Sequence, residues 1–90
     1  MEKICRHIIF YGWVQGVGFR YRAYYAAREN GVTGWIRNLP DGSVEAEVEG
    51  TESAIDAMIM QIEKGRYVRI ERMSVRKMQP VGYRSFEITE

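Results

Sequence analysis

The residues best suited to chemistry stand in one short segment, Gly12–Arg20, which reads Gly-Trp-Val-Gln-Gly-Val-Gly-Phe-Arg. Its glycines let successive backbone N–H groups turn toward one point, a geometry that binds anions. A helix beginning at Phe19 would add first-turn N–H groups and a positive dipole end. Arg20 offers a planar, permanently charged guanidinium that can contact two phosphate oxygens. The segment suggests a phosphoryl site, although a tight turn beside a solvated arginine is the simpler interpretation of Gly16, Gly18 and Arg20 alone.

The elements on either side of this segment must position it. Ile4–Tyr11 is rich in β-branched and aromatic residues and predicts a strand. Phe19–Glu29 predicts a helix whose alanines allow close packing on a sheet, and Gly31 is suited to end it in a left-handed conformation. On the strand, alternate residues share a face. We expect the core-facing set to be Ile4, Arg6, Ile8 and Phe10.

The rest of the chain continues the alternation of strands and helices. Val68–Met78 loses its apolar parity between Ile70 and Met73, which predicts a β-bulge. The further predicted elements are a strand Thr33–Asn38, a turn Leu39–Gly42, a strand Ser43–Glu49, a helix capped by Thr51 or Ser53, and a strand Tyr83–Thr89.

This order, β-α-β-β-α-β with a terminal strand, predicts the α+β class and a ferredoxin-like α/β sandwich. Residues 1–90 should form a single domain with an antiparallel sheet and both helices on one of its faces. The fold hosts enzymes, metal carriers and RNA binders, so it does not select a function.

Composition excludes several classes of function. The formal net charge is +1, which argues against a protein that holds nucleic acid through phosphate neutralisation. No apolar run is long enough to cross a membrane, and no signal peptide is recognisable. We therefore expect a cytoplasmic setting, and we also expect a monomer. With one cysteine, Cys5, and one histidine, His7, a dedicated zinc site is not expected, and no metal or cofactor is predicted.

Structural interpretations are preferred for the other reactive side chains. His7 lies on a predicted strand and is expected to be a structural histidine, and Cys5 a packing residue. Glu45, Glu47 and Glu49 alternate along one strand, a pattern typical of a solvated sheet face.

Three sequence blocks, Val14–Arg20, Gly34–Asn38 and Asp41–Glu45, closely resemble the acylphosphatase family in content and spacing. The resemblance extends over nearly the whole chain. It implies the ferredoxin-like fold and hydrolysis of acyl phosphates to a carboxylate and inorganic phosphate, without a metal ion.

The resemblance also implies a role for individual residues. Arg20 would bind the phosphoryl group, and Asn38 would orient the attacking water. The backbone amides that would bind phosphate are those of Gln15, Gly16, Val17, Gly18 and Phe19. The chain departs from the family pattern at Trp13, where Arg or Lys is usual, and at Leu39, where a small polar residue is frequent. The loop after the second helix is also shorter and lacks a common proline.

The implied reaction suits these residues. A carboxylate leaves readily because its conjugate acid has a pKa of roughly 4, so no strong general acid is required. The protein's task becomes positioning water and neutralising charge on the phosphoryl oxygens. Which group accepts the water's proton is not fixed by the residues; the substrate phosphate is one candidate.

Two other classes remain open. One is a non-catalytic phospho-ligand or regulatory module on the same scaffold; the family's fold also occurs as a domain within larger carbamoyl-phosphate-handling maturation proteins. The other is an RNA binder, but the central strand Ser43–Glu49 is acidic and lacks the aromatic residues that such a sheet uses. The favoured partner is a small acyl phosphate.

Overall fold

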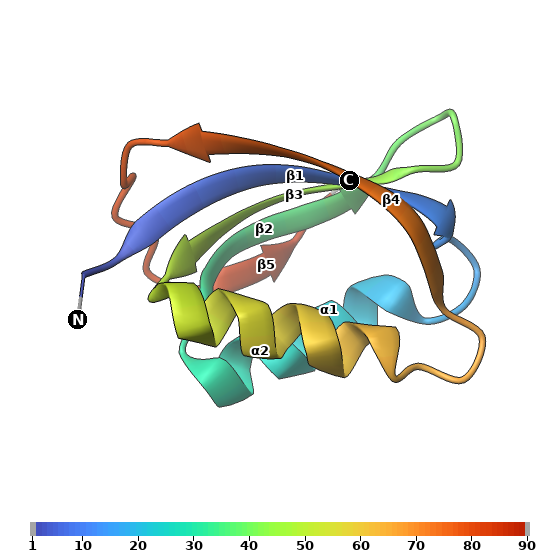
Figure 1. Ribbon diagram of the computed structural model, residues 1–90, viewed down its shortest axis with the longest axis horizontal. Coiled ribbons are helices and arrows are strands. Elements are labelled where there is room, and N and C mark those ends of the chain that lie inside the picture. The colour runs from blue at the N-terminus through green and yellow to red at the C-terminus, as the bar shows by residue number, and fades with distance from the viewer. Residues whose placement is uncertain (1, 90) are drawn as a thin grey trace.

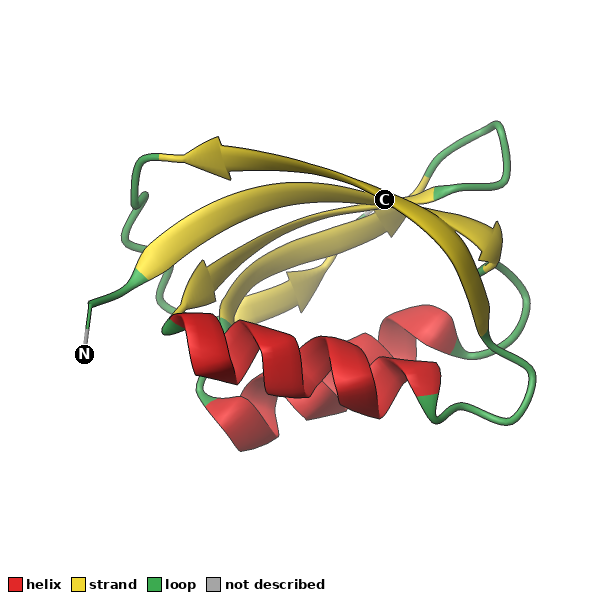
Figure 2. Ribbon diagram, viewed as in Figure 1, coloured by secondary structure: helices red, strands yellow, loops and turns green. Residues whose placement is uncertain are grey.

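The chain forms one curved sheet with two helices packed on one of its faces (Figures 1 and 2). The structure is a computed structural model and describes residues 2–89. The elements are β1 (Ile4–Trp13), α1 (Phe19–Asn30), β2 (Thr33–Asn38), β3 (Val44–Gly50), α2 (Glu52–Glu63), β4 (Arg69–Met78) and β5 (Phe86–Ile88). The predicted class, order and helix placement are confirmed.

The sheet has the strand order β4-β1-β3-β2-β5, and it is mixed rather than antiparallel. β1 pairs antiparallel with both β3 and β4, and β2 pairs antiparallel with β3, but β5 lies parallel to β2. The prediction of a wholly antiparallel sheet was therefore wrong at this edge. The physical reason is chain direction: β4 runs opposite to β2, so a chain that reverses once after β4 arrives beside β2 in the same direction.

The core lies between the helices and the inner face of the sheet. The alternation predicted for β3 is confirmed, because Val44, Ala46 and Val48 are fully buried. The apolar face of α1 consists mainly of small residues, and that of α2 of branched or flexible ones. Both faces are buried against the sheet. The helical side chains in the core are Phe19, Ala23, Ala26, Ala27, Ile55, Met58 and Ile62.

Arg6 is the polar exception in the inward row of β1. Ile8 and Phe10 are buried as expected, whereas the Arg6 guanidinium lies 3.1 Å from the carboxylate of Glu52 and 3.8 Å from that of Asp56. Both carboxylates belong to the first turns of α2. Arg6 therefore faces the helix layer at its edge, where an ion pair replaces an apolar contact.

The predicted bulge is confirmed in β4. Tyr11 pairs with Arg72, but the next residue of β1, Gly12, pairs with Ile70, so Glu71 is the extra residue. Such a bulge bends and twists the strand locally. It lies where β1 approaches the Gly12–Arg20 segment, and β1 itself runs on to Trp13, two residues beyond its predicted end.

The outer face of the sheet is not the solvated surface expected for Glu45, Glu47 and Glu49. Glu49 is only 5% exposed, and its carboxylate accepts hydrogen bonds from the N–H groups of Val81 and Gly82. These residues belong to the connection 79–85 between β4 and β5. Alternation on β3 identified the two faces correctly, but it carried no information on a distant segment that covers one of them.

The other two glutamates also have partners on this face. The Tyr83 hydroxyl donates to Glu47 and accepts from the Trp35 indole N–H at 3.0 Å. Burial, followed by the hydrogen bond to Glu47, raises the pKa of Tyr83.

Cys5 is 1% exposed, and burial raises the pKa of its thiol to about 11, as expected of a packing residue rather than a reactive one.

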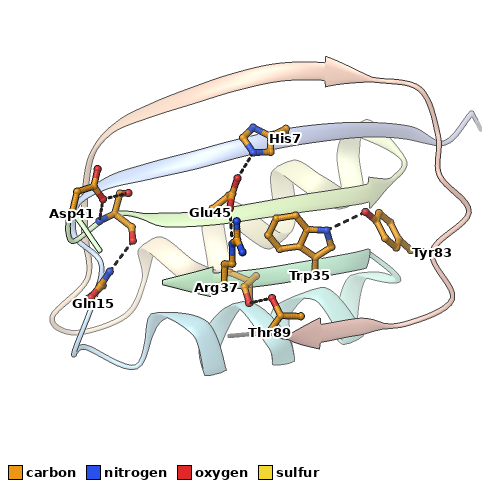
Figure 3. Close-up of polar contacts among 10 residues, drawn as sticks. His7, Gln15, Trp35, Arg37, Asp41, Glu45, Tyr83 and Thr89 are labelled. Atoms are coloured by element: carbon orange, nitrogen blue, oxygen red, sulfur yellow. Dashed lines mark hydrogen bonds and ion pairs between the residues drawn. The ribbon is translucent and has the colours of Figure 1, made fainter. Parts of the chain in front are cut away.

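Glu45 predicts a pH dependence of stability. Its carboxylate lies 2.7 Å from His7 Nε2 and 2.7 Å from Arg37 Nε (Figure 3), and the hydrogen bond to His7, with a smaller contribution from Arg37, lowers its pKa. A carboxyl whose pKa is lowered in the folded state stabilises the protein above its unfolded pKa, and this contribution is lost as pH falls through the folded value. We expect Glu45→Gln to reduce the free energy of unfolding by about 1 kcal/mol at pH 7.

Urea unfolding at pH 7 and at pH 3 measures this effect. The difference between Glu45→Gln and the parent should shrink as pH falls below about 4.5. Glu63→Gln, an exposed change at the end of α2, is the matched control and should alter stability little at either pH. A Glu45→Gln difference that stays constant across this range would contradict the assignment.

Candidate active site

The loop between β1 and α1 is fastened to the core at both ends. Val14 and Phe19 are buried, and Val17 packs partly against the core. The Phe19 ring contacts that of Phe10 edge to face, with 5.0 Å between centroids. Gly16, like Gly18, is exposed between these anchors. The apolar residues therefore hold the loop in place while its main chain faces outward.

Two glycines set the shape of this loop. Gly16 has φ 72° and Gly18 has φ 78°, both in the left-handed region that residues with a Cβ atom adopt at a cost of roughly 1–2 kcal/mol. A Cβ at either position would meet nothing within 4 Å, so the requirement is conformational and not one of space. Gly18 is also the N-cap of α1, and its carbonyl accepts the Arg22 N–H at 3.0 Å.

The main-chain amides of residues 15–19 form a row of donors. Within residues 2–89, none of these N–H groups donates a hydrogen bond to the protein, and Gly18 brings no side-chain cap. The donors stand at the start of a 12-residue helix, whose dipole favours negative charge there. Arg20, half-buried, lies in the same first turn of α1. This arrangement matches the main-chain anion site that the sequence suggested, whose role in binding stays a prediction.

Asn38 lies at the end of β2, on the same side of the sheet as the start of α1. It shares a face with Ile36, which is fully buried. It is opposite Val44 in the pairing with β3, and Val44 in turn is opposite Phe10, whose ring touches Phe19. The fold therefore brings Asn38 toward the loop, although the two are well separated in sequence.

The side-chain oxygen of Asn38 is an unusual acceptor. Oδ1 is buried and accepts no hydrogen bond from any part of the chain that the structure describes. Leaving a buried acceptor unsatisfied costs about 1–3 kcal/mol, and a native structure that keeps one calls for a reason. An acceptor that binds a water during a reaction provides such a reason.

The side chain of Gln15 makes the contact that sequence reasoning missed. Its Nε2 donates to the carbonyl oxygens of Leu39 at 2.7 Å and Ser43 at 2.8 Å. The side chain therefore points from the loop to the β2–β3 hairpin, and Figure 3 shows it directed toward the turn that contains Asp41. The sequence analysis considered only the backbone amide of this residue. A glutamine inside a glycine-rich loop was the available signal, because a long carboxamide there can reach a neighbouring turn.

The hairpin turn is itself held by Asp41. Its carboxylate accepts from the Ser43 N–H at 2.9 Å and from the Ser43 hydroxyl at 2.5 Å. The hydroxyl, followed by the N–H group, lowers the pKa of Asp41. Asp41 therefore remains ionised at neutral pH and closes the turn that begins one residue after Asn38.

Two of the three departures from the family pattern, Trp13 and Leu39, lie at the margins of this site. Trp13 ends β1 opposite Arg69 and is 67% exposed. Leu39 is half-buried and contributes its carbonyl to the contact with Gln15.

Within residues 2–89, no three His, Cys, Asp or Glu side chains lie close enough together to hold a metal ion. No helix in the same range is long and apolar enough to cross a membrane.

Comparison with known proteins agrees with this geometry. A family model described as Acylphosphatase matches residues 6–88. An acylphosphatase from Thermococcus kodakarensis is 42% identical over 89 residues, covering 98% of each chain. The crystal structure of acylphosphatase from Bacillus subtilis superposes with a TM-score of 0.88 at 32% identity, covering 97% of this chain and 99% of that one.

A larger protein contains a similar unit. The structure of full-length HypF in the phosphate- and nucleotide-bound form has a TM-score of 0.85 and 29% identity, covering 99% of this chain but only 12% of HypF.

The fold is that of a ferredoxin-like α+β protein. Before its first helix stands a glycine-rich loop whose N–H groups at 15–19 donate no hydrogen bond within residues 2–89. More particularly, the chain belongs to the acylphosphatase family. The predicted family, and with it the prediction of a hydrolase acting on acyl phosphates, is confirmed. The roles of Arg20, Asn38 and the amides of residues 15–19 stay predictions.

Proposed function

We propose that this chain hydrolyses small acyl phosphates at the β1–α1 loop and releases a carboxylate and inorganic phosphate. The observation that carries the proposal is the row of amides at residues 15–19, which have no acceptor within the described chain and stand at the N-terminus of α1. Arg20 in the first turn and Asn38 at the end of β2 complete the site.

In this scheme Arg20 and the loop amides bind the phosphoryl oxygens. A planar guanidinium and a set of fixed main-chain dipoles stabilise charge without reorganising during the reaction. Phosphoryl transfer requires little covalent chemistry from a protein, so positioning and charge stabilisation can supply most of the catalysis. The loop is suited to this because Val14 and Phe19 hold it against the core.

Asn38 supplies the second function, which is to orient the attacking water. Its carboxamide is neutral and can both accept and donate a hydrogen bond. The unsatisfied Oδ1 supports this assignment, because an acceptor in that state gains a partner when water binds. Neither Arg20 nor Asn38 serves as a nucleophile, so the bond to phosphorus is cleaved by water directly.

The leaving group explains why such a site suffices. A carboxylate departs as a stable anion, whereas an alkoxide requires a proton from a general acid. We therefore propose a reaction without a metal ion, on a free acyl phosphate, with no part for nucleic acid or a membrane. We further propose that the protein acts as a monomer in the cytoplasm.

Phosphate release from benzoyl phosphate and from an alkyl phosphate tests this function. At equal concentration, and after subtraction of the uncatalysed rates, benzoyl phosphate should be cleaved faster by at least about a hundredfold, since no general acid assists the alkoxide. EDTA should leave the rate unchanged. Equal rates on the two substrates, or loss of activity in EDTA, would overturn the proposed mechanism.

A non-catalytic phosphate-binding module is the second candidate, and it is kept because a similar unit forms 12% of the larger protein HypF. The same assay separates the two. A module would bind inorganic phosphate at the loop but release none from benzoyl phosphate above the uncatalysed rate.

A further inference from the structure

The carboxamide of Gln15 donates to the same carbonyl oxygens that accept the hydrogen bonds closing the β2–β3 hairpin. Nε2 lies 2.7 Å from the Leu39 carbonyl oxygen and 2.8 Å from that of Ser43, so each of its two hydrogens has an acceptor. Both acceptors already serve the turn: the Leu39 oxygen accepts the Gly42 N–H, and the Ser43 oxygen accepts the Leu39 N–H. Gln15 therefore contacts the two carbonyls that define the geometry of this turn.

The turn is a firm support for such a contact. Ser43 is 3% exposed, and the Asp41 carboxylate holds both its N–H and its hydroxyl. Leu39, which accepts the first bond from Gln15, directly follows Asn38. On the loop side, Gln15 is the first residue of the row of amides. One side chain thus links the start of the anion site to the residue beside Asn38.

We propose that the Gln15 side chain is a positioning residue that sets the distance between the loop amides and Asn38, and thereby aligns the water with the phosphoryl group. This inference rests on the proposed function, because it assigns the two ends of the link to water and to phosphate. In-line attack depends on that alignment, and a misplacement of about 1 Å can cost roughly a hundredfold in rate. In the proposed function phosphate is bound by the loop amides and Arg20 and does not contact the Gln15 carboxamide, so its binding should depend little on the link.

Gln15→Met tests the inference, since methionine keeps the length of the side chain but removes both donors. We expect kcat for benzoyl phosphate to fall by about tenfold, while KM and the Kd for inorganic phosphate change by less than about threefold. Gln61→Met is the matched control. The Gln61 carboxamide also joins two elements, accepting from Asn30 Nδ2 at 2.9 Å, but it lies on α2 and should leave kcat unchanged.

A double-mutant cycle with Asn38→Ala separates positioning from a general structural effect. If Gln15 acts through Asn38, Gln15→Met should lower kcat by less than about twofold when Asn38 is already alanine. Circular dichroism and thermal unfolding establish that the variants are folded. Gln15→Asn, which keeps the donors but is too short to reach both carbonyls, provides a second variant and should resemble Gln15→Met.

Three results would overturn the inference: an unchanged kcat in both Gln15 variants, an effect confined to KM, or effects of Gln15→Met and Asn38→Ala that multiply. Failure of the proposed function is a different result, because the unmodified chain would then release no phosphate from benzoyl phosphate above the uncatalysed rate.

Discussion

Arg20→Ala should lower kcat/KM for benzoyl phosphate by about a thousandfold, the largest effect expected in this chain. Removal of a single donor to a developing charge costs roughly 10²–10³ in rate, and an arginine that contacts a transferred phosphoryl group contributes more. Inorganic phosphate should also bind more weakly, because in the proposed function the guanidinium contacts the phosphoryl group in the ground state as well as in the transition state. Arg20→Lys should restore little activity, since an ammonium group lacks the planar pair of donors.

Arg22→Ala is the matched control for this prediction. Arg22 lies on the same helix, but its Nε donates to the Gln61 carbonyl oxygen at 3.3 Å, toward α2 and away from the loop. Its loss should leave kcat/KM within about twofold. Phosphate titrations followed by amide NMR should move the signals of residues 15–19 in the parent at lower phosphate concentration than in Arg20→Ala. A folded Arg20→Ala protein with the kcat/KM of the parent would show that the anion site has been misassigned.

Asn38→Ala should have the second largest effect, and unlike Arg20→Ala it should lower kcat without weakening phosphate binding. We expect kcat to fall by about a hundredfold with the Kd for inorganic phosphate within about threefold, because a residue that orients water acts on the chemical step. A comparable loss of phosphate affinity would place Asn38 in the anion site instead. A normal kcat would reduce Asn38 to a turn residue.

Asn38→Ala should lower activity but should not lower stability. Asn38 Oδ1 is buried without a donor in the described chain, so replacing the carboxamide removes an unsatisfied acceptor. Without ligand, the free energy of unfolding of Asn38→Ala should therefore equal or exceed that of the parent. Asn30→Ala is the control: Asn30 Nδ2 donates to Ala26 and Gln61, so its loss should lower stability by about 1 kcal/mol and leave kcat unchanged. Destabilisation by Asn38→Ala would indicate that its oxygen has a structural partner.

Much of the fold could be predicted because local chemistry and tertiary structure agree. β3 shows this most clearly. Its apolar side chains, at every second position, are buried as predicted, since a strand with one face on the core places every second residue inward. Thr51 was one of two candidate caps, and its hydroxyl accepts the Ala54 N–H at 3.2 Å. Gly31 ends α1 with φ 69°, as its position predicted.

The candidate site was predictable for a related reason. An anion site of main-chain donors depends on glycines next to a helix start, and both are local in sequence, as Gly16 and Gly18 show. Asn38 was different, because nothing in its own surroundings distinguishes it from an ordinary turn residue. Its assignment came from the family resemblance, and the structure adds an unsatisfied oxygen on the face of the sheet toward α1.

The sequence by itself predicted the elements, the inward faces of β1 and β3 and the glycine-rich loop before α1, because these follow from periodicity and from the conformations that glycine allows. Only the tertiary structure decided the direction of β5, the burial of Glu49 and the partners of the Gln15 side chain. Each of these depends on segments far apart in the chain: the connection 79–85 covers Glu49, and Gln15 reaches a turn that begins 24 residues later. A local sequence pattern indicates which conformation and which kind of contact a residue favours. Its partner is decided by the tertiary structure, which brings distant segments together.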